Sequence, residues 1–138
     1  MAARQHISLW LLGLWCLLCG PVYGETLAQE VGTLIYVGSD HCPYCRKFEQ
    51  EVGEVYPKTA LSKQLPLVKV DHDRPVSRYA QLNRKVHFVP AYFILGKDDQ
   101  IQASFSGYRG EEFWWYDLER LVAKLQGVKE TQALLLKP

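Results

Sequence analysis

The sequence predicts an α/β fold with a mixed four-stranded sheet, helices on both faces and the element order β-α-β-α-β-β-α. Two observations carry this prediction. Short β-branched and aromatic runs, typical of strands, alternate with segments whose apolar residues recur every three or four positions, typical of helices. The last two strand-like runs are joined by a short turn, as in an antiparallel hairpin. Strands joined through a helix should run parallel, with a right-handed crossover.

The first half of the fold is predicted to begin with a strand over residues 33–37. A helix over residues 42–56 follows, and Pro57 is expected to end it. The buried face of this helix is expected to hold Cys45, Phe48, Val52 and Val55. A short helical turn is predicted within residues 58–64, and the second strand spans residues 67–71.

The second half is predicted to begin with a helix over residues 75–83, which Asp73 is placed to cap. Its inward-facing residues are expected to be Val76, Tyr79 and Leu82. Residues 91–95 and 101–105 form the hairpin. The last helix has acidic residues in its first turn and a buried stripe of Trp114, Leu118, Leu121 and Leu125. No element is assigned to residues 127–138.

The N-terminal segment has the pattern of a secretory signal peptide. Arg4 precedes an apolar run over residues 7–18, and residues 22–24 place small side chains where such peptides are cleaved. We therefore expect residues 1–24 to be a signal peptide and residues 25–138 to be one exported domain, with an uncleaved membrane anchor as the alternative. Cleavage would change 16 basic and 15 acidic residues to 15 of each, so nucleic acid is not an expected partner.

The motif Cys42-Pro43-Tyr44-Cys45 lies where the first strand ends and the first helix begins. Pro43 suits the first helical turn, where its missing N–H costs nothing. Cys42 then lies at the helix start, where unpaired N–H groups and the helix dipole stabilise a thiolate, the reactive form of cysteine. Cys45 lies one turn on and faces the core. Cys42 should therefore attack a substrate disulfide, and Cys45 should resolve the product.

Two other roles are compatible with this motif. One is half of a zinc site, which needs a second ligand pair. Cys16 and Cys19 resemble such a pair, but they lie in the apolar run that export would remove. The other is a structural disulfide, although Cys42 and Cys45 are too close in sequence to join distant parts of a fold. We favour redox chemistry in an oxidising compartment, and expect neither a cofactor nor a metal.

Three features give residues 33–125 a resemblance to the thioredoxin family: the motif at Cys42–Cys45, the Val89-Pro90 step before a strand, and Gly107 after the hairpin. The resemblance implies a minimal thioredoxin-like fold. It also implies that Pro90 is cis and faces the motif. Val89 and Pro90 would then form the edge that binds a substrate chain, with Gly107 leaving room for it. Pro43 and Tyr44 of the motif are further candidate substrate contacts.

Two branches of this family compete. Cys-Pro-Tyr-Cys is the glutaredoxin motif, which makes a glutathione-dependent reductase an alternative, but the chain lacks the Gly-Gly and acidic residues with which glutaredoxins bind glutathione. Residues 107–114, together with the motif and the export signal, are more similar to exported thioredoxin-like proteins of bacterial sulfur oxidation, the SoxS/SoxW type. This similarity implies a periplasmic reductase that keeps a sulfur-carrying cysteine, or another protein thiol, active.

The sequence departs from the thioredoxin pattern in the first strand. Thioredoxins hold a buried acid there that assists deprotonation of the second cysteine, whereas the comparable residue here is Tyr36. The proton acceptor for Cys45 is therefore left open between water and Asp40. His41 and Asp40 are also candidate modulators of the Cys42 thiolate, because charges near a thiolate change its stability.

These observations lead to two hypotheses of different classes. The first is a monomeric thiol–disulfide oxidoreductase that acts on exported proteins with disulfides or modified cysteines and is restored by a membrane electron donor. The second is a binding module or metallochaperone whose two cysteines hold a sulfane sulfur or a soft metal ion such as Cu(I). An intact groove at Pro90 favours the enzyme.

Export is expected to remove residues 1–24, because a positive residue, an apolar run and small residues occur in the order that signal peptidases recognise. Mass spectrometry of the exported protein should therefore show a chain that begins at Glu25. A mature form that still contains Cys16 and Cys19 contradicts this expectation and supports the membrane anchor.

Overall fold

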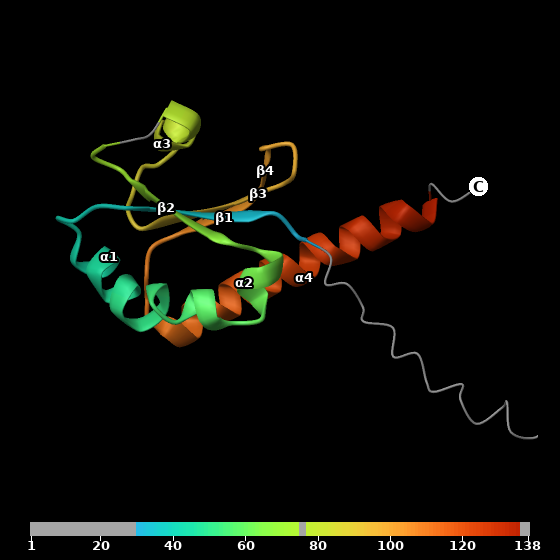
Figure 1. Cartoon of the computed structure of the whole chain (residues 1–138), viewed down its shortest axis with the longest axis horizontal. Coiled ribbons are helices and arrows are strands. Elements are labelled where there is room, and N and C mark those ends of the chain that lie inside the picture. Colours follow the sequence, from blue (N-terminus) through green and yellow to red (C-terminus); the bar gives the residue numbers. More distant parts are fainter. Residues whose placement is uncertain (1–29, 75–76, 136–138) are drawn as a thin grey trace, which may run out of the picture.

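The computed structural model describes residues 30–74 and 77–135, and it has the predicted α/β fold (Figure 1). The elements in chain order are β1 (Thr33–Gly38), α1 (Pro43–Phe48), the π-helical segment η2 (Glu49–Gly53), the 3₁₀ turn η3 (Tyr56–Lys58), α2 (Leu61–Gln64), β2 (Leu67–Asp71), the 3₁₀ turn η4 (Ser77–Tyr79), α3 (Ala80–Asn83), β3 (Ala91–Leu95), β4 (Ile101–Ser106) and α4 (Glu111–Leu135). The predicted signal peptide lies outside the described residues.

The four strands form one mixed sheet in the order β2-β1-β3-β4. Strand β1 runs parallel to β2, with Leu34 opposite Leu67, and antiparallel to β3. Strands β3 and β4 form the predicted antiparallel hairpin. Strand β1 is buried and pairs with a neighbouring strand on each side. The motif follows β1 after the short loop of residues 39–41.

Helices cover both faces of the sheet, as predicted. Figure 1 shows α1, α2 and α4 on one face and α3 on the other. Alternate residues of β1 point to opposite faces, as the pleat of a strand requires. Leu34 and Tyr36 join the cluster beneath α1 and α4, whereas Ile35 and Val37 join the cluster that includes Leu82 of α3.

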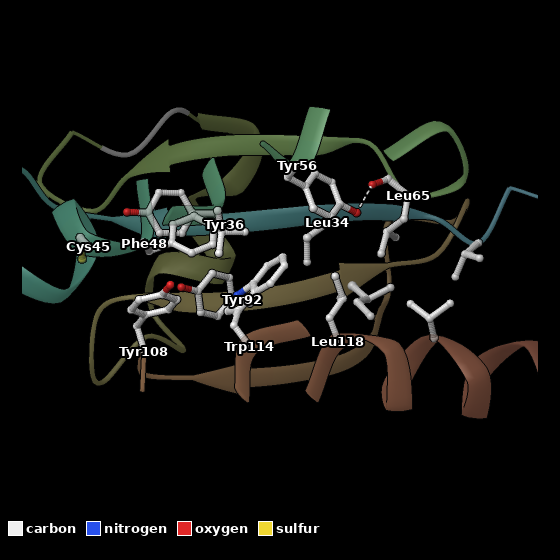
Figure 2. Packing of buried hydrophobic residues seen from close by; sticks show 14 residues of the cluster. Leu34, Tyr36, Cys45, Phe48, Tyr56, Leu65, Tyr92, Tyr108, Trp114 and Leu118 are labelled. Carbon is white, nitrogen blue, oxygen red and sulfur yellow. Dashed lines mark hydrogen bonds between the residues drawn. The ribbon is translucent and has the colours of Figure 1, made fainter. Parts of the chain in front are cut away.

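An aromatic cluster joins the motif helix to the sheet and to α4 (Figure 2). Phe48 of α1 is fully buried at its centre, with its ring centroid 4.6 Å from Tyr36 of β1, 5.1 Å from Tyr92 of β3 and 5.3 Å from Trp114 of α4. Aromatic pairs at these separations attract each other beyond their burial of apolar area. The helix that carries both cysteines is thereby fixed to three other elements.

The predicted single helix over residues 42–56 is wrong. The α-helix ends at Phe48, and a π-helical segment follows it. There the Glu54 N–H donates a hydrogen bond to the Glu49 carbonyl oxygen 3.2 Å away. The wider π turn shifts the buried face by one residue. Val55, expected in the core, is therefore 47% exposed, and Tyr56 is buried in its place, with its hydroxyl donating to the Leu65 carbonyl oxygen.

Two other predicted elements differ from the structure. The helix expected over residues 75–83 is described from Ser77, as a 3₁₀ turn followed by α3, and residues 75–76 lie outside the described part. The last helix continues to Leu135, although no element was assigned after residue 126. Lys129 in this extension donates a hydrogen bond to the Val31 carbonyl oxygen at 2.7 Å.

The buried stripe of α4 also differs in detail. Trp114 and Leu118 are buried as expected, but Leu121 and Leu125 are only half-buried, and Val122 contributes to the core instead. Within residues 30–74 and 77–135, no helix is long and apolar enough to cross a membrane.

The π-helical segment can be tested with two matched substitutions. Val52→Ala should lower the free energy of unfolding by about 2 kcal/mol, because Val52 is fully buried and its methyl groups would leave a cavity. Val55→Ala should change it by less than about 0.5 kcal/mol, because Val55 is largely exposed. Urea unfolding measures both. Equal losses for the two variants would indicate the uninterrupted α-helix that the sequence predicted.

Candidate active site

Cys42 is the residue that caps the N-terminus of α1. Its backbone is extended, with φ −92° and ψ 115°, and Pro43 occupies the first helical turn as expected. The Cys45 N–H donates a hydrogen bond to Cys42 Sγ over 3.1 Å. An N–H group at a helix start that points at a sulfur atom stabilises negative charge on it. The half-buried Cys42 is thus placed to act as the nucleophile.

Cys45 lies in a different environment, one turn further along α1. Its side chain is only 2% exposed and belongs to the aromatic cluster. Burial, together with a hydrogen bond to Cys42, raises the pKa of the Cys45 thiol to about 11. Cys45 is therefore protonated at neutral pH, and the two free thiols of the motif are chemically unequal.

The loop before β3 faces Cys42. The Val89–Pro90 peptide bond is cis, as the family resemblance implies. The Cys42 thiol donates to the Val89 carbonyl oxygen at 3.5 Å, which places the backbone of this loop against the nucleophile. Gly107, with φ +84°, donates its N–H to the Pro90 carbonyl oxygen over 2.8 Å, and a Cβ added at Gly107 would meet no atom within 4 Å. There is thus open space beside the predicted substrate edge.

Exposed side chains surround Cys42. Pro43 and Tyr44 of the motif are exposed, Tyr44 at 62%, and Phe88 is 76% exposed beside Val89. Exposed aromatic side chains offer a large apolar contact area to a partner. Phe88 was not singled out from the sequence, although an aromatic residue just before a Val-Pro step is a readable signal.

His41 and Asp40, the two candidate modulators, lie in the loop before α1 and both are exposed. The Asp40 carboxylate faces the Arg74 guanidinium at 3.7 Å, and the Asp40 carbonyl oxygen accepts a hydrogen bond from Arg46. The His41 N–H donates to Ser39 Oγ. The polar side chain that adjoins Cys45 is instead that of Tyr36. The sequence predicted the position of Tyr36 in the first strand, but not its contact with the Cys45 sulfur.

In the described part of the chain, no group of three or more His, Cys, Asp or Glu residues is arranged to hold a metal ion. Cys42 and Cys45 are therefore not part of such a group among the described residues.

The chain belongs to the thioredoxin-like domain family, whose model matches residues 24–118. Among solved structures, it is similar to the periplasmic thioredoxin SoxS from Paracoccus pantotrophus in its reduced form, with 26% identity and a TM-score of 0.57 over 66% of this chain and 95% of that one. The fold is also that of the germline-specific thioredoxin Deadhead from Drosophila melanogaster, with 20% identity and a TM-score of 0.51 over 91% of this chain and 99% of that one. No curated protein matches the chain.

The environment of Cys45 predicts a distinctive pH profile. In a Cys42→Ser variant, alkylation of Cys45 should be slow at pH 7 and rise about tenfold per pH unit, because only the thiolate reacts. The profile should level off above the ordinary pKa of 9.0, since burial, the largest cause of the shift, remains in the variant. Iodoacetamide labelling followed by mass spectrometry measures this rate. A plateau reached by pH 8 would show that Cys45 is not in a desolvated site.

Proposed function

We propose that this protein is an exported thiol–disulfide oxidoreductase that reduces disulfides in other exported proteins. The observation that carries the proposal is the inequality of the two thiols. Cys42 caps a helix next to the Val89 backbone, and Cys45 is buried behind it with its pKa raised to about 11. A nucleophile open to a partner and a resolving thiol protected from it are the two parts that disulfide exchange requires.

The exchange proceeds in two steps. The Cys42 thiolate attacks one sulfur of the substrate disulfide, forms a mixed disulfide and releases the other substrate sulfur as a thiolate, which takes up a proton. Cys45 then loses its proton and attacks Cys42 Sγ, so that the Cys42–Cys45 disulfide forms and the second substrate thiol leaves. Two electrons pass from the dithiol to the substrate, and an external donor of two electrons must restore the dithiol.

The reducing direction rests on the similarity to a periplasmic thioredoxin. A couple is strongly oxidising when its reduced form is stabilised, for example as a thiolate. The buried Cys45 adds no such stabilisation, because its thiol is protonated at neutral pH. Export to the periplasm is supported by the predicted signal peptide and by the similarity to a periplasmic thioredoxin. A sulfur-carrier cysteine of another protein is the substrate that this similarity favours.

The two matched variants Cys42→Ser and Cys45→Ser test the proposal, with insulin as the model disulfide. Cys42→Ser should reduce insulin only at the uncatalysed rate, because it lacks the nucleophile. Cys45→Ser should still attack but not resolve, so that a covalent complex between insulin and Cys42 accumulates. Non-reducing electrophoresis with mass spectrometry of the adduct measures both results.

The reverse pattern contradicts the assignment. If Cys42→Ser accumulates the covalent complex through Cys45, the roles of the two thiols are exchanged. If the wild-type protein does not reduce insulin faster than dithiothreitol alone, the oxidoreductase function is wrong for this class of substrate.

A further inference from the structure

The hydroxyl group of Tyr36 lies at the end of a buried ring, next to the resolving cysteine. The Tyr36 ring packs 4.6 Å from Phe48 and 5.7 Å from Tyr92, measured between centroids. Figure 2 shows its hydroxyl pointing along the sheet toward α1, where Cys45 lies. A Cβ added at Gly38 would lie 2.2 Å from this hydroxyl oxygen. The ring is therefore held between Phe48 and the Gly38 backbone, and its hydroxyl has little freedom to move.

Tyr36 and Cys45 act on each other. Burial raises the pKa of Tyr36 well above its usual range, and the adjacent Cys45 raises it further, so Tyr36 remains a neutral hydrogen-bond donor. In the opposite direction, burial raises the pKa of Cys45, while hydrogen bonding from the Tyr36 side chain lowers it. A phenol that keeps its proton and favours the thiolate of its neighbour behaves as a donor to that thiolate.

A cavity of about 430 Å³ adjoins both groups and gives protons a route to solvent. Cys45, Tyr36 and Gly38 are among the residues that line it. The charged side chains that line it are Asp40, Arg46, Glu49, Lys69, Asp71 and Arg74. They are largely paired, Glu49 with Lys69, and Asp71 and Asp40 with Arg74. Tyr92 of β3 lies near both Tyr36 and Cys45, since each of them raises its pKa.

We propose that Tyr36 is a positioning residue whose hydroxyl donates a hydrogen bond to the Cys45 thiolate as Cys45 attacks the mixed disulfide. This role rests on the proposed oxidoreductase function. The proton leaves Cys45 Sγ for water in the cavity, the Tyr36 hydroxyl keeps its own proton, and the electron pair of the thiolate forms the bond to Cys42 Sγ as the substrate thiolate leaves. A buried thiolate, which otherwise has a hydrogen bond from the Ser39 backbone, is thereby stabilised further at the moment it must react.

The test compares Tyr36→Phe with Tyr92→Phe, both in a Cys42→Ser background. Tyr92 is a matched control, because its hydroxyl is buried in the same cluster but has no hydrogen-bond partner within the described structure. Removing the Tyr36 hydroxyl should move the alkylation profile of Cys45 to higher pH and slow alkylation at a fixed pH by about tenfold, the size expected for a hydrogen bond to a charged group. Tyr92→Phe should leave the rate within about twofold.

A second measurement follows the resolving step, in which Cys45 attacks the mixed disulfide. With Cys42 present, the decay of a preformed mixed disulfide with a glutathione or insulin thiol should slow by a similar factor in Tyr36→Phe, whereas alkylation of Cys42 should not change. If Tyr36→Phe does not fold, Gly38→Ala replaces it as the test, because a Cβ at Gly38 would clash with the Tyr36 hydroxyl oxygen and with the ring carbon that bears it, so that the end of the ring must leave its position.

The outcomes separate this inference from the proposed function. Equal alkylation profiles for Tyr36→Phe and Tyr92→Phe overturn the role of Tyr36, even if the wild-type protein reduces insulin. A shift confined to Tyr36→Phe supports the hydrogen bond even if insulin is not a substrate, because alkylation needs no substrate protein.

Discussion

A hydrogen bond from the Cys45 backbone N–H to Cys42 Sγ, 3.1 Å long, links the two cysteines of the motif across the first turn of α1, and the site depends on it. It can form only if the helix begins at Pro43, which leaves Cys42 outside the helix and Cys45 within it. The burial of Cys45 then follows from the position of Phe48 three residues later, in contact with rings from β1, β3 and α4. Reactive groups that must keep a fixed geometry need such support from rigid elements.

The sequence predicted the strands best, and the bounds of β2 and β3 agree with the structure, although β2 is a partly exposed edge strand and β3 is buried throughout. It failed where tertiary contacts decide between similar local structures. The apolar spacing that placed Val55 in the core assumes 3.6 residues per turn, whereas the π-helical segment brings Tyr56 inward, where its ring stacks on Trp115 and its hydroxyl finds the Leu65 carbonyl. The last turns of α4 lack a continuous buried stripe, so periodicity did not reveal them.

In the candidate site, too, local signals could be read from the sequence and tertiary contacts could not. The motif and the Val-Pro step are local signals, and both could be read from the sequence. The contact between Tyr36 and Cys45 could not, because it depends on how far α1 lies above β1 and on the absence of a side chain at Gly38. Membership of the thioredoxin-like domain family supports disulfide exchange as the proposed chemistry. It leaves the substrate to be recognised by residues that belong to this chain, among which Tyr44 of the motif and Phe88, the residue before Val89, are exposed aromatic side chains.

The most direct test of the account is the reduction potential of the Cys42–Cys45 couple, measured by equilibration with glutathione buffers. Because the chain belongs to the thioredoxin-like domain family and is similar to a periplasmic thioredoxin, we predict a reversible two-electron couple with a reduction potential of about −270 mV, the value typical of reducing thioredoxins. A potential near about −120 mV, typical of strong disulfide donors, would contradict the reducing direction. Failure of the pair to form a reversible disulfide would contradict the oxidoreductase itself.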